Sequence, residues 1–212
     1  MKKYIREIIL LVLIIVFCVS VFTYFNKNKN TNIMTNENNT VIKNLTDQDS
    51  NLFKDDKVGF SISIPKDYKI DENYSYQALG PGKEILGIKF TIPLSMATGT
   101  NLGQDTYLSI ENIPNLKSCS AKNFLDQQIS IKENILEENG LKYSVASSSD
   151  AGAGNRYNEF VYTVLEKNKC IAVRYFIHYS VFENYPAGSI KEFNEQDLIN
   201  KFDKIRKTLI IN

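Results

Sequence analysis

Three cysteines and one histidine are the residues of this chain best suited to chemistry. Cys18 lies in an apolar N-terminal run, whereas Cys119 and Cys170 lie in the main body, at the starts of an expected helix and an expected strand. No C-x-x-C spacing and no neighbouring imidazole marks either of them as reactive. We expect a structural disulfide between Cys119 and Cys170, which would close a loop of about 50 residues. Two buried thiols or a catalytic cysteine are the alternatives.

The only histidine, His178, falls in the segment CIAVRYFIHY, where it shares a strand face with Arg174. One histidine cannot build a histidine-rich zinc site, and no cysteine or carboxylate cluster with metal-ligand spacing accompanies it. No G-x-S-x-G sequence marks a serine as a nucleophile. We therefore expect no catalytic residues, no metal and no cofactor. The sequence leans against an enzyme without deciding the question.

Aromatic side chains gather just after His178, in HYSVFENYPAGSIKEF. Tyr179, Phe182 and Tyr185 can line a pocket or a contact surface, because aromatic rings give a large contact area at a low cost in conformational entropy. Together with His178 and Arg174 they form the candidate contact set for a ligand or a partner. The alternative is that these rings close the open end of the core.

Alternation of apolar and polar residues predicts the strands that would position these side chains. In VGFSISIP, Phe60, Ile62 and Ile64 alternate with serines, and Pro65 removes a ladder donor. Lys167–Lys169 reads as a tight hairpin turn between two long segments. The expected strands are residues 58–65, 85–92, 106–113, 142–147, 155–166 and 170–181.

Two helices are expected among these strands. The first runs from about Ala121 to Asn134, with an apolar face of roughly helical spacing. The second follows Asn194 as N-cap, with Asp197 in the capping-box position. Its apolar stripe is formed by Leu198, Ile199, Phe202, Ile205 and Leu209. The pattern predicts an α+β fold, a mainly antiparallel sheet covered by helices.

The N-terminus carries the signature of a membrane anchor. Lys2, Lys3 and Arg6 precede an uncharged run of 18 residues, Ile8–Phe25. A helix of that length spans roughly 27 Å, close to the hydrocarbon thickness of a bilayer. We expect residues 1–25 to form an uncleaved transmembrane helix, with the rest of the chain extracytoplasmic, periplasmic or at the cell surface. A cleaved signal peptide is one alternative, and lipidation at Cys18 is another, which the preceding Phe17 disfavours.

Beyond the anchor, residues 26–51 are dominated by asparagine, threonine and charged side chains. Such a segment buries too little apolar surface to fold alone, and we expect it to be a flexible linker. Residues 52–212 have the length of a single domain with its own core. Without Lys2, Lys3, Arg6 and Glu7 the chain has 22 basic and 23 acidic residues. A nucleic-acid partner is not expected from a chain with no basic surplus.

Several segments resemble known proteins. The stretch CIAVRYFIHYSVFENYPAGSIKEF, followed by FDKIRKTL, resembles a group of exported bacterial proteins of unknown function. The opening FSISIPKDY and the final helix are similar to the PsbP-like α/β/α sandwich. That resemblance implies an accessory or assembly subunit without a shared catalytic constellation, and it transfers no site residues.

We therefore expect a membrane-tethered, non-catalytic module that binds a protein partner or helps to assemble a complex of the cell envelope. The alternative is a small-molecule or lipid-binding domain with a pocket near the last strand, either without catalytic activity or with hydrolase activity.

Overall fold

The computed structural model describes residues 49–114, 116, 118–126 and 131–212. From Ser50 onward these residues form one compact unit built from two antiparallel sheets and few helices. The expected anchor, residues 1–25, and nearly all of the expected linker lie outside the described residues. No helix in the described ranges is long and apolar enough to cross a bilayer.

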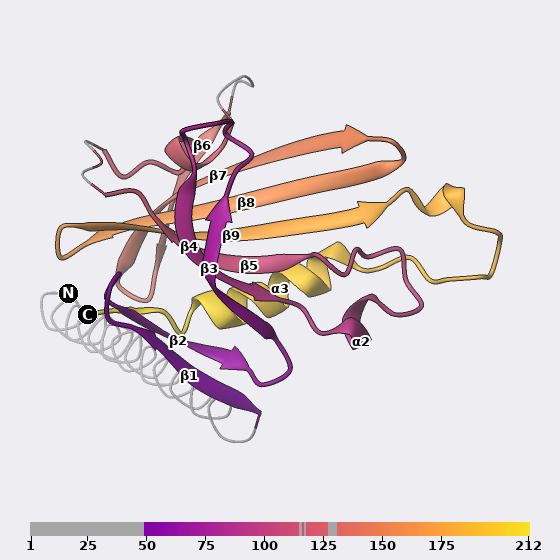
Figure 1. The fold of residues 1–212 in the computed structure, drawn as a ribbon, viewed down its shortest axis with the longest axis horizontal. Helices are drawn as coiled ribbons and strands as arrows, with labels where there is room; N and C mark the ends of the chain where they lie inside the picture. Colours follow the sequence, from indigo (N-terminus) through magenta and orange to yellow (C-terminus); the bar gives the residue numbers. More distant parts are fainter. Residues whose placement is uncertain (1–48, 115, 117, 127–130) are drawn as a thin grey trace, which may run out of the picture. The chain divides into compact units, whose positions relative to one another are not determined.

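The larger sheet has seven strands in the order β3-β4-β5-β9-β8-β7-β6, and every neighbouring pair is antiparallel (Figure 1). Its long central strands form the hairpins β7–β8 and β8–β9. The strands are β3 (Lys69–Tyr76), β4 (Ile85–Thr91), β5 (Tyr107–Asn112), β6 (Glu133–Glu138), β7 (Leu141–Gly152), β8 (Asn155–Glu166) and β9 (Lys169–Ser180).

A smaller sheet and one long helix pack on one face of the seven-stranded sheet. The smaller sheet has the order β1-β2-β10, with β1 (Ser50–Asp55), β2 (Phe60–Pro65) and β10 (Ile210–Ile211). The helix α3 (Glu195–Arg206) runs beside the larger sheet (Figure 1). Apolar residues of both sheets and of α3 form one buried cluster, with Phe60, Phe90, Tyr175 and Phe202 fully buried.

The buried side chain of Arg206 connects α3 to this core. Arg206 Nε donates to the Tyr175 hydroxyl at 2.9 Å, and that hydroxyl donates to Asp203 Oδ1 at 2.8 Å. The guanidinium also lies 4.3 Å from the centre of the Tyr162 ring. Charge-assisted hydrogen bonds of this kind fix the orientation of the helix on the sheet.

The expected antiparallel sheet is confirmed, and several of its strands match closely. The segment 155–166 is β8, residues 85–92 contain β4, and Lys167 and Asn168 take the positive φ values of a tight turn before β9. Asn194 caps α3 as expected, because its side chain accepts from the Asp197 amide at 3.1 Å. The elements that pack on the larger sheet differ from the expectation, because the three-stranded sheet packs there together with α3.

The helix expected over residues 121–134 is wrong. Only a short 3₁₀ turn, η1 (Ala121–Phe124), forms there, and β6 begins at Glu133 and pairs with β7. Phe124 and Leu125 are buried beside the sheet, but Ile135 is 59% exposed on β6. These residues therefore do not share one helical face. The apolar spacing reflected two separate elements, and cross-strand pairing outweighed local helix propensity.

Four strands and two short helical turns have no counterpart in the expected elements. The strands are β1, β3, β6 and β10, and the turns are α2 (Leu94–Ala97) and η2 (Phe182–Asn184). Strand β1 begins at Ser50, two residues before the expected domain boundary at Leu52. Strand β3 carries three charged side chains, so its sequence lacks the apolar alternation that identifies a strand.

Candidate functional site

The face of the seven-stranded sheet turned away from α3 has two differently built halves. We call the end beside the disulfide the covered half; its sheet residues are Tyr76, Ile85, Glu111, Ala172, Arg174 and Val161. We call the other end the open half; its sheet residues are Lys69, Thr91, Lys89, Tyr107, Phe176, Tyr157 and His178. The strand registers place each set on one face. A second buried cluster, containing Phe124 and Leu125, packs on the covered half.

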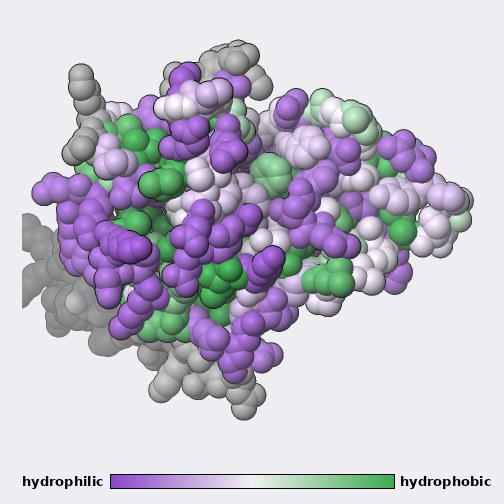
Figure 2. Space-filling view, viewed as in Figure 1, coloured by the Kyte–Doolittle hydropathy of each residue, from purple (hydrophilic) through white to green (hydrophobic). Residues whose placement is uncertain are grey.

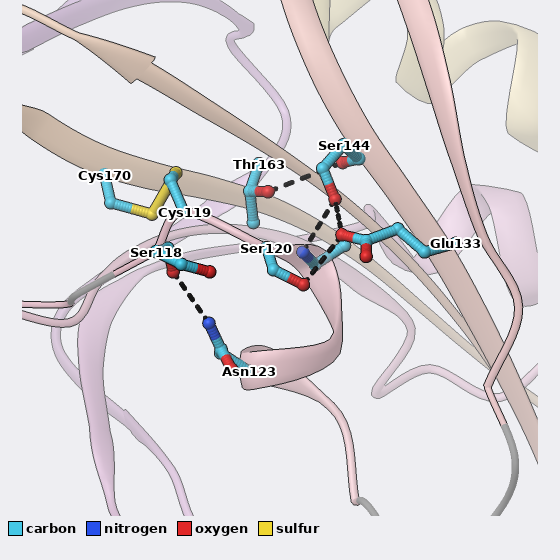
Figure 3. The surroundings of a disulfide bond; sticks show 9 residues. Ser118, Cys119, Ser120, Asn123, Glu133, Ser144, Thr163 and Cys170 are labelled. Atoms are coloured by element: carbon cyan, nitrogen blue, oxygen red, sulfur yellow. Dashed lines mark hydrogen bonds between the residues drawn. A yellow bond between two sulfur atoms is a disulfide. The ribbon is translucent and has the colours of Figure 1, made fainter.

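A disulfide holds the segment that packs on the covered half. Cys119 and Cys170 are bonded, with their Cα atoms 5.4 Å apart, so the disulfide expected from the sequence is confirmed (Figure 3). Beside it, the Ser120 hydroxyl donates to Glu133 Oε1 at 2.7 Å, and the Ala121 amide donates to the Ser144 hydroxyl at 2.8 Å. The disulfide and these hydrogen bonds join the segment around η1 to strands β6, β7 and β9.

Arg174 lies at the centre of the covered half and is completely buried. Its guanidinium donates to both carboxylate oxygens of Glu111, at 2.8 and 2.9 Å, and also to Glu159 and to the Phe124 carbonyl. The Tyr76 hydroxyl donates to Glu159 at 2.9 Å, and the Tyr76 ring lies 3.5 Å from the guanidinium carbon. Burial by itself lowers the pKa of Arg174, but the attraction of Glu111 outweighs burial and raises the pKa well above its ordinary value.

An aromatic strip, formed by Tyr74, Tyr107, Phe176 and Tyr157, crosses the open half from β3 to β8. The Tyr107 and Phe176 rings are stacked with centroids 4.9 Å apart, and the Tyr74 and Tyr107 hydroxyls are 2.7 Å apart. Burial raises the pKa values of Tyr74 and Tyr107 well above the ordinary tyrosine value, so both hydroxyls are neutral at physiological pH. Phe176 and Tyr157 remain partly exposed.

Lys89 lies over one end of the aromatic strip. Its ammonium is 5.1 Å from the Tyr74 ring centre and 5.8 Å from that of Tyr107, and it pairs with Asp71 at 3.5 Å. A cation above aromatic rings is attracted by their electron-rich faces. These contacts hold Lys89 against the strip while its side chain stays 29% exposed.

His178 and Asp105 form a hydrogen-bonded pair at the other side of the strip. His178 Nδ1 lies 2.6 Å from Asp105 Oδ1, and the imidazole stacks on Tyr157 at 4.6 Å. Within the described part of the chain, His178 Nε2 is buried without a hydrogen-bond partner. A histidine–carboxylate pair orients the imidazole, which is the positioning part of a general base.

A pocket of about 670 Å³ opens beside the aromatic strip. Tyr107 and Phe176 form part of its lining, and Ile92, Pro93 and the 60% exposed Leu94 give it an apolar wall. The polar lining residues are Asp67, Lys69, Lys89, Thr91, Gln104 and Asp105. This volume lies within the range of small-molecule sites, and the lining is more polar than is usual for them. Figure 2 shows hydrophobic groups scattered among hydrophilic ones on the face that it presents.

The structure distributes the five expected contact residues over four places. His178 borders the open half, whereas Tyr179 lies on the opposite side of β9 and packs on Phe193 at 4.9 Å. Phe182 lies in η2 and Tyr185 directly follows it, 36% exposed. Arg174 is buried in the covered half, where its donors are occupied. The structure therefore does not bring these five side chains together, and their contact role stays a prediction.

The pocket was missed in the sequence because several of its residues come from segments without a strand signal. Lys69 and Asp67 belong to β3 and the turn before it, and Asp105 belongs to the loop before β5. A partial signal was present in ILGIKFTI, where Lys89 and Thr91 alternate with apolar residues and so share one face. Among the residues that the structure describes, no group of three or more His, Cys, Asp or Glu side chains is placed to hold a metal ion.

Comparisons with known proteins identify similar structures but no family. No family model matches the chain, and no curated protein matches it. Among solved structures, the solution structure of cyanobacterial PsbP from Synechocystis sp. PCC 6803 is 14% identical with a TM-score of 0.44, covering 77% of this chain and 93% of that one. A crystal structure from Bacteroides thetaiotaomicron is 12% identical with a TM-score of 0.43, and 78% of this chain matches 49% of its length. The first of these has the PsbP-like fold named from the sequence, and similarity at this level carries no argument about function.

Proposed function

We propose that this chain is a non-catalytic ligand-binding module, held on the extracytoplasmic side of a membrane by residues 1–25 and carried on the linker 26–51. The open half of the sheet face contains its binding site. The observation that carries this proposal is the pocket beside Tyr107 and Phe176, where partly exposed aromatic and apolar groups adjoin charged side chains.

The proposal is supported by a difference in hydrogen bonding between the polar side chains of the two halves. In the covered half, the donors of Arg174 are satisfied inside the protein. In the open half, the side chains of Lys69, Thr91 and Gln104 make no hydrogen bond or ion pair with any residue that the structure describes. Unpaired polar groups beside an apolar wall are the usual means by which a pocket orients a ligand.

Photo-crosslinking in native membranes tests this proposal. A benzoylphenylalanine at Gln104, on the pocket rim, is expected to capture a defined adduct, whereas the same group at Gln196 on α3 serves as the matched exposed control. Mass spectrometry gives the mass of the captured species. Equal labelling at both positions, or none at Gln104, would contradict a binding site in the pocket.

A second candidate is assembly with a protein of the cell envelope, as the sequence led us to expect. Tyr185 favours it, because this large side chain is 36% exposed in the connection between β9 and α3. Exposed tyrosines are enriched where proteins meet. A photo-crosslinker at Tyr185 that captures one protein, while the Gln104 position captures nothing, would favour this candidate over the pocket.

A further inference from the structure

The charged side chains of the pocket are segregated along the strand direction. Lys69, Thr91, Tyr107 and Phe176 are successive register partners across β3, β4, β5 and β9, so they form one row. Asp67 lies two residues before Lys69, and Asp105 lies two residues before Tyr107. Because β3 and β5 run in the same direction, both aspartates lie on the same side of the row.

Lys89 lies on the other side of this row. It precedes Thr91 by two residues on β4, which runs opposite to β3 and β5. The contact between Asp105 and His178 supports this layout independently, because His178 follows Phe176 by two residues on β9. The pocket therefore has a basic end, made by Lys69 and Lys89, and an acidic end, made by Asp67 and Asp105.

The charge balance of the lining favours a ligand that carries both charges over a simple ion. An anion would meet the two aspartates, a cation would meet the two lysines, and an uncharged ligand would pair with neither. Lys89 is already shared with Asp71 and Asp105 with His178. The Lys69 ammonium and the Asp67 carboxylate have no ion pair or hydrogen bond within the described ranges. A ligand that carries both charges satisfies both ends.

The spacing of the two ends sets the size of that ligand. Asp67 and Asp105 lie in the turns before β3 and β5, two residues before Lys69 and Tyr107. Two fully extended residues span about 7 Å, which is the upper limit of the step from the row of Lys69 to the aspartates. An extended dipeptide spans about 7 Å between its ends. Its apolar side chains would contact Leu94 and Pro93 on one side and the partly exposed Phe176 on the other.

We propose that the pocket binds a short zwitterionic peptide of about dipeptide size, with its carboxylate at Lys69 and Thr91 and its ammonium at Asp67 and Asp105. This inference rests on the proposed function and names the ligand class of the same pocket. The hydroxyl of Thr91, which is the register partner of Lys69, donates to the carboxylate. The apolar wall then selects peptides with aliphatic or aromatic side chains.

Calorimetric titration of the full chain in mild detergent with L-leucyl-L-phenylalanine tests the proposal. We expect saturable binding, weakened about tenfold or more when the peptide is N-acetylated or C-amidated, because each cap removes one charge-assisted contact. Lys69→Gln should weaken binding of the free dipeptide but not of its amide, and Asp67→Asn should weaken binding of the free dipeptide but not of its acetylated form. Lys201→Gln, at an exposed position of α3, is the matched control and should change nothing.

Three outcomes overturn the inference: no saturable binding at about 10 mM dipeptide, equal binding of free and capped peptides, or equal effects of Lys69→Gln and Lys201→Gln. Lys69 and Asp67 are both exposed, so neither substitution should disturb folding, and matching thermal unfolding curves verify this. Failure here is distinguishable from failure of the proposed function. A photo-adduct at Gln104 of another chemical class would keep the binding site and discard the peptide.

Discussion

The covered half and the open half belong to the same face of one sheet, yet they place charge in opposite ways. In the covered half, Arg174 and Glu111 are both completely buried, and each satisfies the other. In the open half, Lys69 is exposed and Lys89 only partly covered, and the carboxylate of Asp105 is 64% exposed. Buried charge must be paired within the fold, whereas exposed charge remains available to a ligand. We therefore expect the covered half to contribute to stability, and we propose the open half as the binding surface.

Among the substitutions that test this comparison, replacing the buried Arg174 should lower the free energy of unfolding the most. Arg174→Met leaves Glu111 and Glu159 without their cation, and we expect the free energy of unfolding to fall by about 3–5 kcal/mol. Arg156→Met is the matched control, because Arg156 is exposed and donates only to a neighbouring carbonyl. Urea unfolding followed by circular dichroism measures both. A loss for Arg174→Met within about 0.5 kcal/mol of the control would refute a stabilising role for the cluster.

Removing the disulfide should have the next largest effect. A sequence separation of 51 residues between Cys119 and Cys170 corresponds to a loss of about 4 kcal/mol in the chain-entropy model, and the measured range is about 2–4 kcal/mol. The double variant Cys119→Ser/Cys170→Ser should therefore melt earlier, and reduction of the wild type should reproduce the shift.

Cys18→Ser provides the control for cysteine removal itself, and it should leave the unfolding curve unchanged. Alkylation of the unreduced, denatured chain gives a direct check. Modification of both Cys119 and Cys170 under those conditions would show that the bond is not formed in the protein.

In the open half, adding one methyl group at Gly103 should disturb the contact between His178 and Asp105 while the rest of the fold stays intact. A Cβ atom at Gly103 would lie 2.7 Å from both His178 Nδ1 and Asp105 Oδ1. Gly103→Ala should therefore displace this pair and cost about 1–2 kcal/mol as local overpacking. Gly152→Ala, where the added atom meets nothing within 4 Å, is the matched control.

NMR gives the local readout, because His178 is the only imidazole in an untagged chain. Its ring signals should move in Gly103→Ala and stay in place in Gly152→Ala. Unchanged imidazole signals in both variants would mean that Gly103 does not hold the histidine against Asp105.

The sequence predicted most reliably the segments whose pattern and partners are local. The hairpin of β8 and β9 is contiguous, its strands alternate strongly, and its turn lies at Lys167 and Asn168. The N-cap at Asn194 likewise depends on a residue only three positions away. The prediction of a helix over 121–134 failed because the conformation of that segment depends on interactions with distant residues. These are the disulfide between Cys119 and Cys170 and the pairing of β6 with β7.

The candidate site depended still more on distant pairing. His178 lies beside the open half and its contact role stays a prediction, whereas its neighbour Tyr179 was grouped with it although alternation along β9 places the two on opposite faces. Lys69 meets Thr91, and Thr91 meets Tyr107, only through the registers of three strands. One of those strands, β3, is too polar to be recognised from its sequence. Side-chain types alone therefore could not reveal that two lysines and two aspartates surround one pocket.

Acid should weaken the covered half slightly, and this is the smallest effect that we expect. Hydrogen bonds from the Ser144 and Ser120 hydroxyls lower the pKa of Glu133 below its ordinary value (Figure 3). A group whose pKa is lower in the folded state than in the unfolded state stabilises the fold above its unfolded pKa, and this contribution is lost as the pH falls through the folded value. The wild type should therefore lose stability between about pH 5 and pH 3 in part because Glu133 becomes protonated.

Glu133→Gln separates this contribution from the titration of the other carboxyl groups. The variant keeps an amide oxygen that can accept from Ser144 and Ser120 but cannot take up a proton, so its stability should depend less on pH over the same interval. Urea unfolding of both proteins at about pH 7 and about pH 3.5 gives the difference. Identical slopes would mean that the link between η1 and β6 is not sensitive to the charge of Glu133, and that the disulfide, the hydrogen bond from the Ala121 amide to Ser144 and the buried Phe124 and Leu125 hold this segment on the covered half.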